Sequence, residues 1–369
     1  MMVPYLDLSK SYHAIWTELE SAFSRVLKSG HVILGDEVRE FEELYARFSS
    51  VKYCAGVGNG LDALTLALHA LGVREGDEVI VPSNTYIATL IAVSRVGATP
   101  VPVESKIDTY NIDPQQIVRA ITKKTKAIMP VHLFGQACQM DEVMEIAGQY
   151  KLSVVEDNAQ SHGATFKNKI TGSFGDINAT SFYPGKNMGA IGDGGAVTTN
   201  SKHLYEQTLL LRNYGEIRKY YNDTIGYNSR LDELQAAFLK VRLKHLENNT
   251  KKRREIAATY QKELAGTDDI ILPAVEKYAT HVYHIYAIRT KKRDALQAHL
   301  KENHIVTLIH YPVPPHLQKA YKALGYTKGR FPIAEELADT LLSLPIFPEI
   351  SKEQLNYVIS TIKNFYKGR

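Results

Sequence analysis

The most informative part of this chain reads Ser181-Phe182-Tyr183-Pro184-Gly185-Lys186-Asn187-Met188-Gly189-Ala190-Ile191-Gly192-Asp193-Gly194-Gly195. Five of the eleven residues from Gly185 to Gly195 are glycine, whereas glycine makes up about 7% of an average protein. Such a loop lets the backbone approach a bulky, flat group while the amine of Lys186 reaches it. A lysine that forms a Schiff base must be neutral part of the time, and partial enclosure lowers its pKa accordingly. The loop therefore indicates a reactive lysine, although an isolated lysine of this kind is more often an exposed residue in a flexible loop.

A second informative segment reads Val154-Val155-Glu156-Asp157-Asn158-Ala159-Gln160-Ser161-His162-Gly163. Its apolar start indicates a buried parallel strand, and open α/β sheets bind ligands at the carboxyl ends of such strands. Asp157 stands at that end, where a buried carboxylate can keep the ring nitrogen of pyridoxal phosphate (PLP) protonated and so make the ring an electron sink. Gln160 can hydrogen-bond the phenolic oxygen of the same cofactor. A helix cap is the alternative role of Asp157.

A third segment is a glycine-rich turn that reads Gly56-Val57-Gly58-Asn59-Gly60-Leu61-Asp62-Ala63-Leu64. A turn between a strand and a helix exposes unpaired N–H groups at the positive end of the helix, which suits a phosphate. The spacing is neither that of a dinucleotide-binding turn nor that of a P-loop. Tyr86 lies at the next strand-to-helix turn, where its ring can stack on a planar cofactor. A core or surface tyrosine is the alternative.

Short β-branched runs alternate with helical patterns through roughly the first 200 residues. Strands separated by helices of ten or more residues imply βαβ crossovers and a mostly parallel sheet with helices on both faces. From Arg230 to about Leu264 the pattern predicts one long helix, or two joined, and a smaller α+β part follows it. Expected strands include 53–57, 78–81, 99–103, 126–131, 152–156, 282–288 and 305–309. We predict an α/β fold with a large domain at 1–245 and a small C-terminal domain at 246–369.

Composition narrows the classes of function. The chain has 369 residues, a net charge of +4 and two cysteines. A charge this small, spread along the chain, gives no case for a nucleic-acid partner. We expect no disulfide framework, because two cysteines are too few, and no metal site, because the histidines lack the spacing of metal ligands. We also expect no signal peptide and no membrane span, because the N-terminus does not fit the first and no apolar run is long enough for the second. A cytoplasmic location is the resulting expectation.

The order of these motifs resembles the DegT-type sugar-nucleotide aminotransferases, which are PLP enzymes of the aspartate-aminotransferase fold, called fold type I. The resemblance rests on the glycine turn, the aromatic, Asp-x-x-Gln and Ser-x-x-x-x-Lys in one order. It extends over essentially the whole chain, from Val3-Pro4-Tyr5-Leu6-Asp7-Leu8 through Gly226-Tyr227-Asn228-Ser229-Arg230-Leu231-Asp232-Glu233-Leu234-Gln235-Ala236-Ala237 to His310-Tyr311-Pro312-Val313-Pro314. It implies a large domain with a mostly parallel sheet of the seven-stranded type.

The resemblance also implies roles for single residues. Lys186 corresponds to the Schiff-base lysine and Asp157 to the partner of the pyridinium nitrogen, which makes these two the catalytic candidates. The remaining cofactor contacts implied are Ser181 with the backbone amides of Gly60 and Leu61 on the phosphate, Tyr86 stacked on the ring, Gln160 on the phenolic oxygen, and Asn228 on the phosphate of a neighbouring subunit. Family members usually carry a small hydroxyl residue where Leu61 stands, so only its amide is available here. Tyr183, His310 and Tyr311 correspond to residues that hold the sugar nucleotide.

The implied activity is transfer of an amino group from glutamate, which leaves as 2-oxoglutarate, to a nucleotide-linked keto-sugar. Because Tyr183 stands where C4-aminating members more often carry histidine, the resemblance favours C3 of a dTDP-linked 3-keto-6-deoxyhexose. The role of Asn228 implies a homodimer with shared active sites. Two alternatives stay open: a C4-aminating relative that acts on a UDP- or dTDP-4-keto sugar, and a non-catalytic PLP-binding regulator. A sugar dehydratase of this fold is disfavoured, because those enzymes carry histidine where this chain has Lys186.

Overall fold

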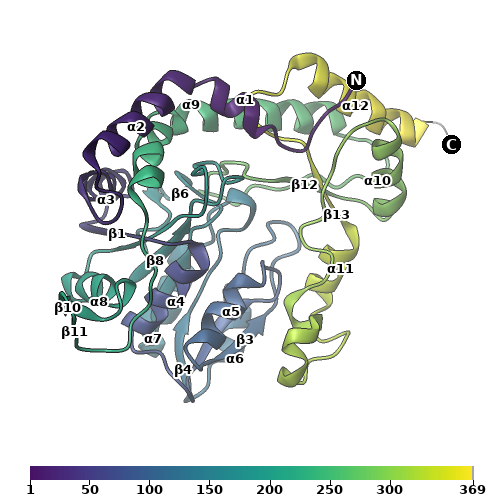
Figure 1. Cartoon of the computed structure of the whole chain (residues 1–369). Helices are drawn as coiled ribbons and strands as arrows, with labels where there is room; N and C mark the ends of the chain where they lie inside the picture. Colours follow the sequence, from purple (N-terminus) through teal and green to yellow (C-terminus); the bar gives the residue numbers. More distant parts are fainter. Residues whose placement is uncertain (368–369) are drawn as a thin grey trace.

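A seven-stranded sheet forms the centre of the computed structural model, which describes residues 1–367 (Figure 1). β9 pairs antiparallel with both β1 and β8, and every other neighbouring pair is parallel. This arrangement confirms the predicted α/β fold with a mostly parallel sheet. The strands, in spatial order, are β1 (Tyr53–Val57), β9 (Gly195–Thr199), β8 (Ile177–Ser181), β5 (Ser153–Asp157), β4 (Thr125–Ile128), β2 (Glu78–Pro82) and β3 (Thr99–Val103).

Helices cover both faces of this sheet because its strands are apolar on both sides. In β2, Val79 and Val81 pack into the core cluster that holds α4 and α5, whereas Ile80 faces the opposite cluster with α6 and α7. This alternation follows from the period of two in a strand. The helices of the first face are α4 (Gly60–Ala70), α5 (Ala88–Arg95) and α8 (Lys202–Arg212); those of the second are α3 (Asp36–Phe48), α6 (Pro114–Ala120) and α7 (Met140–Tyr150).

The C-terminal part surrounds a second apolar core built on the far half of α9. That single helix runs over Glu233–Leu264 and packs against the strand pair β12–β13 and helix α12. The elements of this part are β12 (Tyr286–Arg289), β13 (Leu341–Leu344), α10 (Arg293–Glu302), α11 (Pro332–Thr340), α12 (Lys352–Lys367) and the 3₁₀ helices Pro315–Leu317 and Lys319–Leu324. Because α9 passes residue 245 without a break, the division at that residue falls inside one helix, and it stays a prediction.

The remaining elements are short or peripheral. At the N-terminus α1 (Leu8–His13) and α2 (Trp16–Ser29) lie along α9 (Figure 1). The small hairpins are β6 (Thr165–Phe166) with β7 (Lys169–Ile170) and β10 (Glu216–Arg218) with β11 (Tyr221–Asn222), and a 3₁₀ turn spans Leu133–Gly135.

Three predicted strands need correction. The strand expected at 305–309 is wrong, because Ile305 bridges Val3 and Leu308 bridges Ser343 only as isolated pairs with different partners. The strand expected at 282–288 is restricted to Tyr286–Arg289, since Tyr283 has a φ of 47° and so leaves the extended region. The strand expected at 126–131 ends at Ile128, two residues before Pro130, which has no N–H to donate to a ladder.

Candidate active site

A cavity of about 650 Å³ lies at the carboxyl ends of the central strands. β5 ends at Asp157 and β8 ends at Ser181, while α4 begins beside them at Gly60. Ligands of open α/β sheets bind at this edge. Of the eleven site residues predicted from the sequence, ten line the cavity: Gly60, Leu61, Tyr86, Asp157, Gln160, Ser181, Tyr183, Lys186, His310 and Tyr311.

Asn228 is the predicted site residue that does not line this cavity. It is exposed, and its backbone forms an isolated bridge with Asn213 beside the β10–β11 hairpin. A residue that acts on the site of a neighbouring subunit is expected to point away from its own cavity. The predicted contact of Asn228 with a phosphate needs a second copy of the chain, and it stays a prediction.

Lys186 extends from the glycine-rich loop that follows β8. Its amide donates to the carbonyl of Tyr183 at 2.8 Å, so the loop turns tightly here. Gly189 makes this turn possible, because a Cβ on it would lie 2.2 Å from the carbonyl oxygen of Pro184. Burial of the amine lowers the pKa of Lys186 from 10.5 to about 8, and the nearby carboxylate of Asp157 opposes the shift. A substantial fraction of the amine is therefore neutral near physiological pH, as a Schiff-base lysine requires.

Asp157 is buried at the end of β5. Its Oδ1 accepts from the amide of Ala159 at 3.1 Å, and its Oδ2 accepts from the hydroxyl of Thr89 at 3.2 Å. Burial raises the pKa of Asp157, while the Ala159 amide, Lys186 and Thr89 oppose that rise. A buried carboxylate of this kind is stabilised by a cationic partner, which the protonated ring nitrogen of PLP supplies. The carboxylate therefore fits the role predicted for it.

Gln160 has a fixed orientation. Its Oε1 accepts from the amide of Phe134 at 2.7 Å. Because a backbone N–H can only donate, this bond identifies which side-chain atom of Gln160 is the oxygen and which is the nitrogen. Its Nε2 therefore points the other way and donates to the hydroxyl of Tyr311 at 3.2 Å. A donor in this place suits an anionic phenolic oxygen.

The opposite end of the cavity has the properties of a phosphate cradle. Gly60 and Leu61 are the first residues of α4, where helix N–H groups have no acceptor within the helix. A Cβ on Gly60 would lie only 2.5 Å from the Cβ of Ser181, so glycine is required for α4 and β8 to approach. Amides, a hydroxyl and a helix N-terminus together suit a phosphate. The residues of the cavity thus fit PLP along its whole length.

Aromatic and histidine side chains surround the mouth of the cavity. Tyr86 and Tyr183 are more than half exposed, and the ring of Tyr86 lies 5.3 Å from that of Tyr311. Tyr311 thus contacts the two residues predicted to hold the cofactor ring, Gln160 and Tyr86. His310 bonds the hydroxyl of Ser343 through Nδ1 at 2.8 Å. Burial lowers the pKa of His310 to about 4, so its imidazole is neutral at physiological pH.

Sequence reasoning missed two contributors to the site. The sequence does contain a signal for Thr89, which contacts Asp157. Its spacing from Thr85 puts both hydroxyls on one side of a helical turn. His284 lines the cavity but lies in a segment of irregular backbone, and no sequence pattern points to it.

Among the described residues, no cluster of three or more histidine, cysteine or acidic side chains can hold a metal ion. Within residues 1–367, no helix is long and apolar enough to cross a membrane.

The phosphate cradle gives a first prediction. Gly60→Ala should weaken PLP binding by roughly tenfold or more, because its Cβ collides with Ser181 and displaces a hydrogen-bonding group of the cradle. A PLP titration followed by visible absorbance measures the change. Gly148→Ala is the matched control, since a Cβ there meets nothing within 4 Å. Equal PLP affinity in Gly60→Ala and the wild type would contradict the cradle.

The shifted lysine gives a second prediction. Only the neutral amine attacks an aldehyde, so the rate of PLP uptake by PLP-free protein should rise with pH and level off above about 8, the pKa of Lys186. An unshifted lysine would let the rate rise until about pH 10.4. Stopped-flow absorbance over a pH series distinguishes the two profiles, and a midpoint near 10 would exclude the proposed burial of the amine.

Comparison with known proteins agrees with this geometry. The family model of the DegT/DnrJ/EryC1/StrS aminotransferases matches residues 14–363. The chain is 50% identical over 364 residues to a dTDP-3-amino-3,6-dideoxy-alpha-D-galactopyranose transaminase of Aneurinibacillus thermoaerophilus, which covers 99% of both chains. It is also 46% identical over 369 residues to a pleiotropic regulatory protein of Geobacillus stearothermophilus, covering 100% of this chain and 99% of that protein.

Among solved structures, DesV of S. venezuelae in complex with a ketimine intermediate superimposes with a TM-score of 0.98, at 46% identity and with 99% of each chain covered. Sequence and structure agree over nearly the full length. The chain therefore belongs to the DegT/DnrJ/EryC1/StrS aminotransferase family and is a PLP-dependent transaminase.

Proposed function

We propose that this enzyme moves an amino group from glutamate to C3 of a dTDP-linked 3-keto-6-deoxyhexose in amino-sugar biosynthesis. The observation that carries the proposal is one cavity in which a lysine with a pKa of about 8 lies close to a buried carboxylate, Asp157. The likeness to a transaminase named for a dTDP-3-amino-3,6-dideoxyhexose directs the choice of sugar.

In this proposal Lys186 is the base and acid of the reaction. Its Nζ would take the proton from the glutamate carbon that bears the amino group and deliver it to C4′ of the cofactor. In the sugar half-reaction the same amine would move a proton in the opposite direction, from C4′ to C3 of the sugar. Bound PLP supplies the electron sink for the charge left on that carbon. Asp157 holds the proton at the ring nitrogen, and Gln160 offers its Nε2–H to the phenolic oxygen. The neutral imidazole of His310 can bind the sugar nucleotide without adding a positive charge beside Lys186.

The position of the substrate follows from the arrangement of the cavity. The phosphate cradle at Gly60 and Ser181 would fix one end of the cofactor, and we propose that the sugar binds beside Tyr183 and His310, which line the same cavity. Tyr311 already contacts Gln160, so this tyrosine can close over the reacting carbon and the cofactor ring together. Positioning of this kind lowers the barrier by removing orientational freedom before the reaction.

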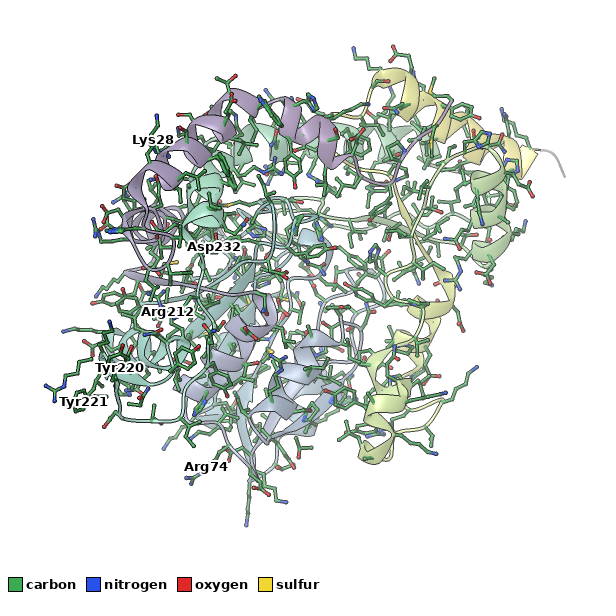
Figure 2. All side chains as sticks on the ribbon, viewed as in Figure 1. Lys28, Arg74, Arg212, Tyr220, Tyr221 and Asp232 are labelled. Carbon is green, nitrogen blue, oxygen red and sulfur yellow. The ribbon has the colours of Figure 1, made fainter. Side chains whose placement is uncertain are left out.

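A homodimer with shared active sites is part of the proposal. Large apolar side chains are exposed near the β10–β11 hairpin, and Figure 2 shows Tyr220 and Tyr221 extending away from the body of the molecule. Tyr220 and Ile225 are 82% and 89% exposed, which is costly for a lone chain and typical of an interface. A second copy is the proposed occupant, and it would receive Asn228 at its phosphate. We also propose a cytoplasmic location, with which the two free, buried cysteines are consistent.

Two alternative functions can be distinguished from the proposed one by experiment. A C4-aminating relative would accept 4-keto sugars, and a PLP-binding regulator would bind the cofactor without turnover. The second alternative has a specific basis, because one similar protein is named a pleiotropic regulatory protein.

The substrate is tested with a panel of 3-keto and 4-keto sugars linked to dTDP and to UDP, with the aminated carbon located by NMR. We expect amination at C3 of the dTDP-3-keto-6-deoxyhexoses and turnover at least about a hundredfold slower with 4-keto sugars, because a displaced carbonyl misses Lys186. Amination at C4 would overturn the regiochemistry. Bound PLP without reaction toward glutamate would support the regulator.

The shared site is tested by mixing two inactive variants. Asn228→Asp repels the phosphate of the neighbouring site, and Lys186→Ala removes the base. Mixed dimers contain one intact site if Asn228 acts across the interface, so an equimolar mixture refolded together should reach about a quarter of wild-type activity by random assortment. The same test can use Asn228→Asp mixed with wild-type chain in which borohydride has reduced the C=N bond between Lys186 and the cofactor, which blocks the lysine permanently. No gain on mixing would place Asn228 outside the neighbouring site.

A further inference from the structure

Two threonine hydroxyls stand in series behind the carboxylate of Asp157. The hydroxyl of Thr89 donates to Oδ2 of Asp157 at 3.2 Å, and the hydroxyl of Thr85 lies 2.9 Å from that of Thr89. Both threonines are buried, with 1% and 2% of their surface exposed. They belong to the turn that leads into α5 and to the first turn of that helix. The other oxygen of Asp157 is already used by the amide of Ala159.

The direction of this chain of hydrogen bonds follows from the number of protons available. An ionised carboxylate only accepts hydrogen bonds, so Thr89 donates its single hydroxyl proton to Asp157. Thr85 must then donate to Thr89, since Thr89 has no second proton to give. Hydroxyl groups arranged in this order polarise one another, which strengthens the final bond to the carboxylate.

We propose that Thr89, supported by Thr85, is a positioning residue that keeps Asp157 ionised and aimed at the ring nitrogen of the cofactor. This inference rests on PLP as the cofactor and does not depend on which sugar is aminated. Its consequence concerns one proton, which Asp157 and the ring nitrogen share. With Thr89 present, that proton stays on the ring; without it, the carboxylate gains the proton and the ring becomes a neutral, weaker electron sink.

The surroundings of Asp157 give Thr89 this influence. Burial raises the pKa of the carboxyl group, and the opposing contributions come from the Ala159 amide, Lys186, Thr89 and His132. The charge of this carboxylate also acts on Tyr311, whose phenol pKa is raised by burial first and by Asp157 in addition. In the loaded enzyme Lys186 is bonded to the cofactor, so the protein groups left to stabilise the charge of Asp157 are the Ala159 amide, the Thr89 hydroxyl and His132.

The test uses the PLP-loaded enzyme with ¹⁵N in the cofactor ring. In Thr89→Val the ring ¹⁵N signal should move from the pyridinium position toward that of neutral pyridine at a pH where the wild type keeps the pyridinium. The glutamate half-reaction should slow by roughly tenfold, the typical effect of losing a hydrogen bond to a charged group. Thr89→Ser, which keeps the hydroxyl, should restore both values. Thr85→Val should shift the signal in the same direction by less.

A matched control separates this role from general packing. Thr208 is equally buried, its hydroxyl bonds the carbonyl of Leu204, and it lies in α8. Thr208→Val should leave the ¹⁵N signal unchanged. A wild-type ¹⁵N signal and half-reaction rate in both Thr89→Val and Thr85→Val would overturn the inference. Because the signal is read without any sugar, a wild type that fails to aminate 3-keto sugars would refute the proposed function and leave this test intact.

Discussion

The structure depends on one electrostatic constraint: an amine and a carboxylate must both be kept from water and still remain reactive. Lys186 loses basicity because it is buried, and Asp157 would become protonated for the same reason unless other groups hold its charge. Each group partly corrects the shift of the other. This mutual dependence requires Lys186, in the loop after β8, and Asp157, at the end of β5, to meet at one cavity. It also requires further hydrogen bonds to the carboxylate.

The central sheet holds the residues around this site in fixed relative positions. β5 and β8 are neighbouring parallel strands, so their last residues, Asp157 and Ser181, are fixed with respect to one another by backbone hydrogen bonds. The tight approach of Gly60 to Ser181 then sets where α4 begins and where a phosphate can bind. A cofactor anchored at both ends by rigid elements needs little support from mobile side chains. The residues at the mouth, such as Tyr183, are left free to contact the substrate.

Much of this could be predicted from the sequence, because the relevant residues occur in short motifs at strand ends. Asp157, Ser181 and Lys186 belong to this group, and the fold class followed from the alternation of strands and helices. The rest depends on contacts between distant segments. The bond of Thr89 to Asp157 spans 68 residues, and the failure of 305–309 to form a strand reflects two competing partners, Val3 and Ser343. The role of Asn228 needs a second chain, which no single-chain pattern or structure supplies.

The central claim is that Lys186 moves the proton that makes amino transfer possible. The most direct measurement adds glutamate to the PLP-loaded enzyme in a single turnover and follows 2-oxoglutarate and the visible absorbance of the bound cofactor. We predict one 2-oxoglutarate per active site for the wild type, and none on the same timescale for PLP-loaded Lys186→Ala. Formation of 2-oxoglutarate by Lys186→Ala at the wild-type rate would contradict the account.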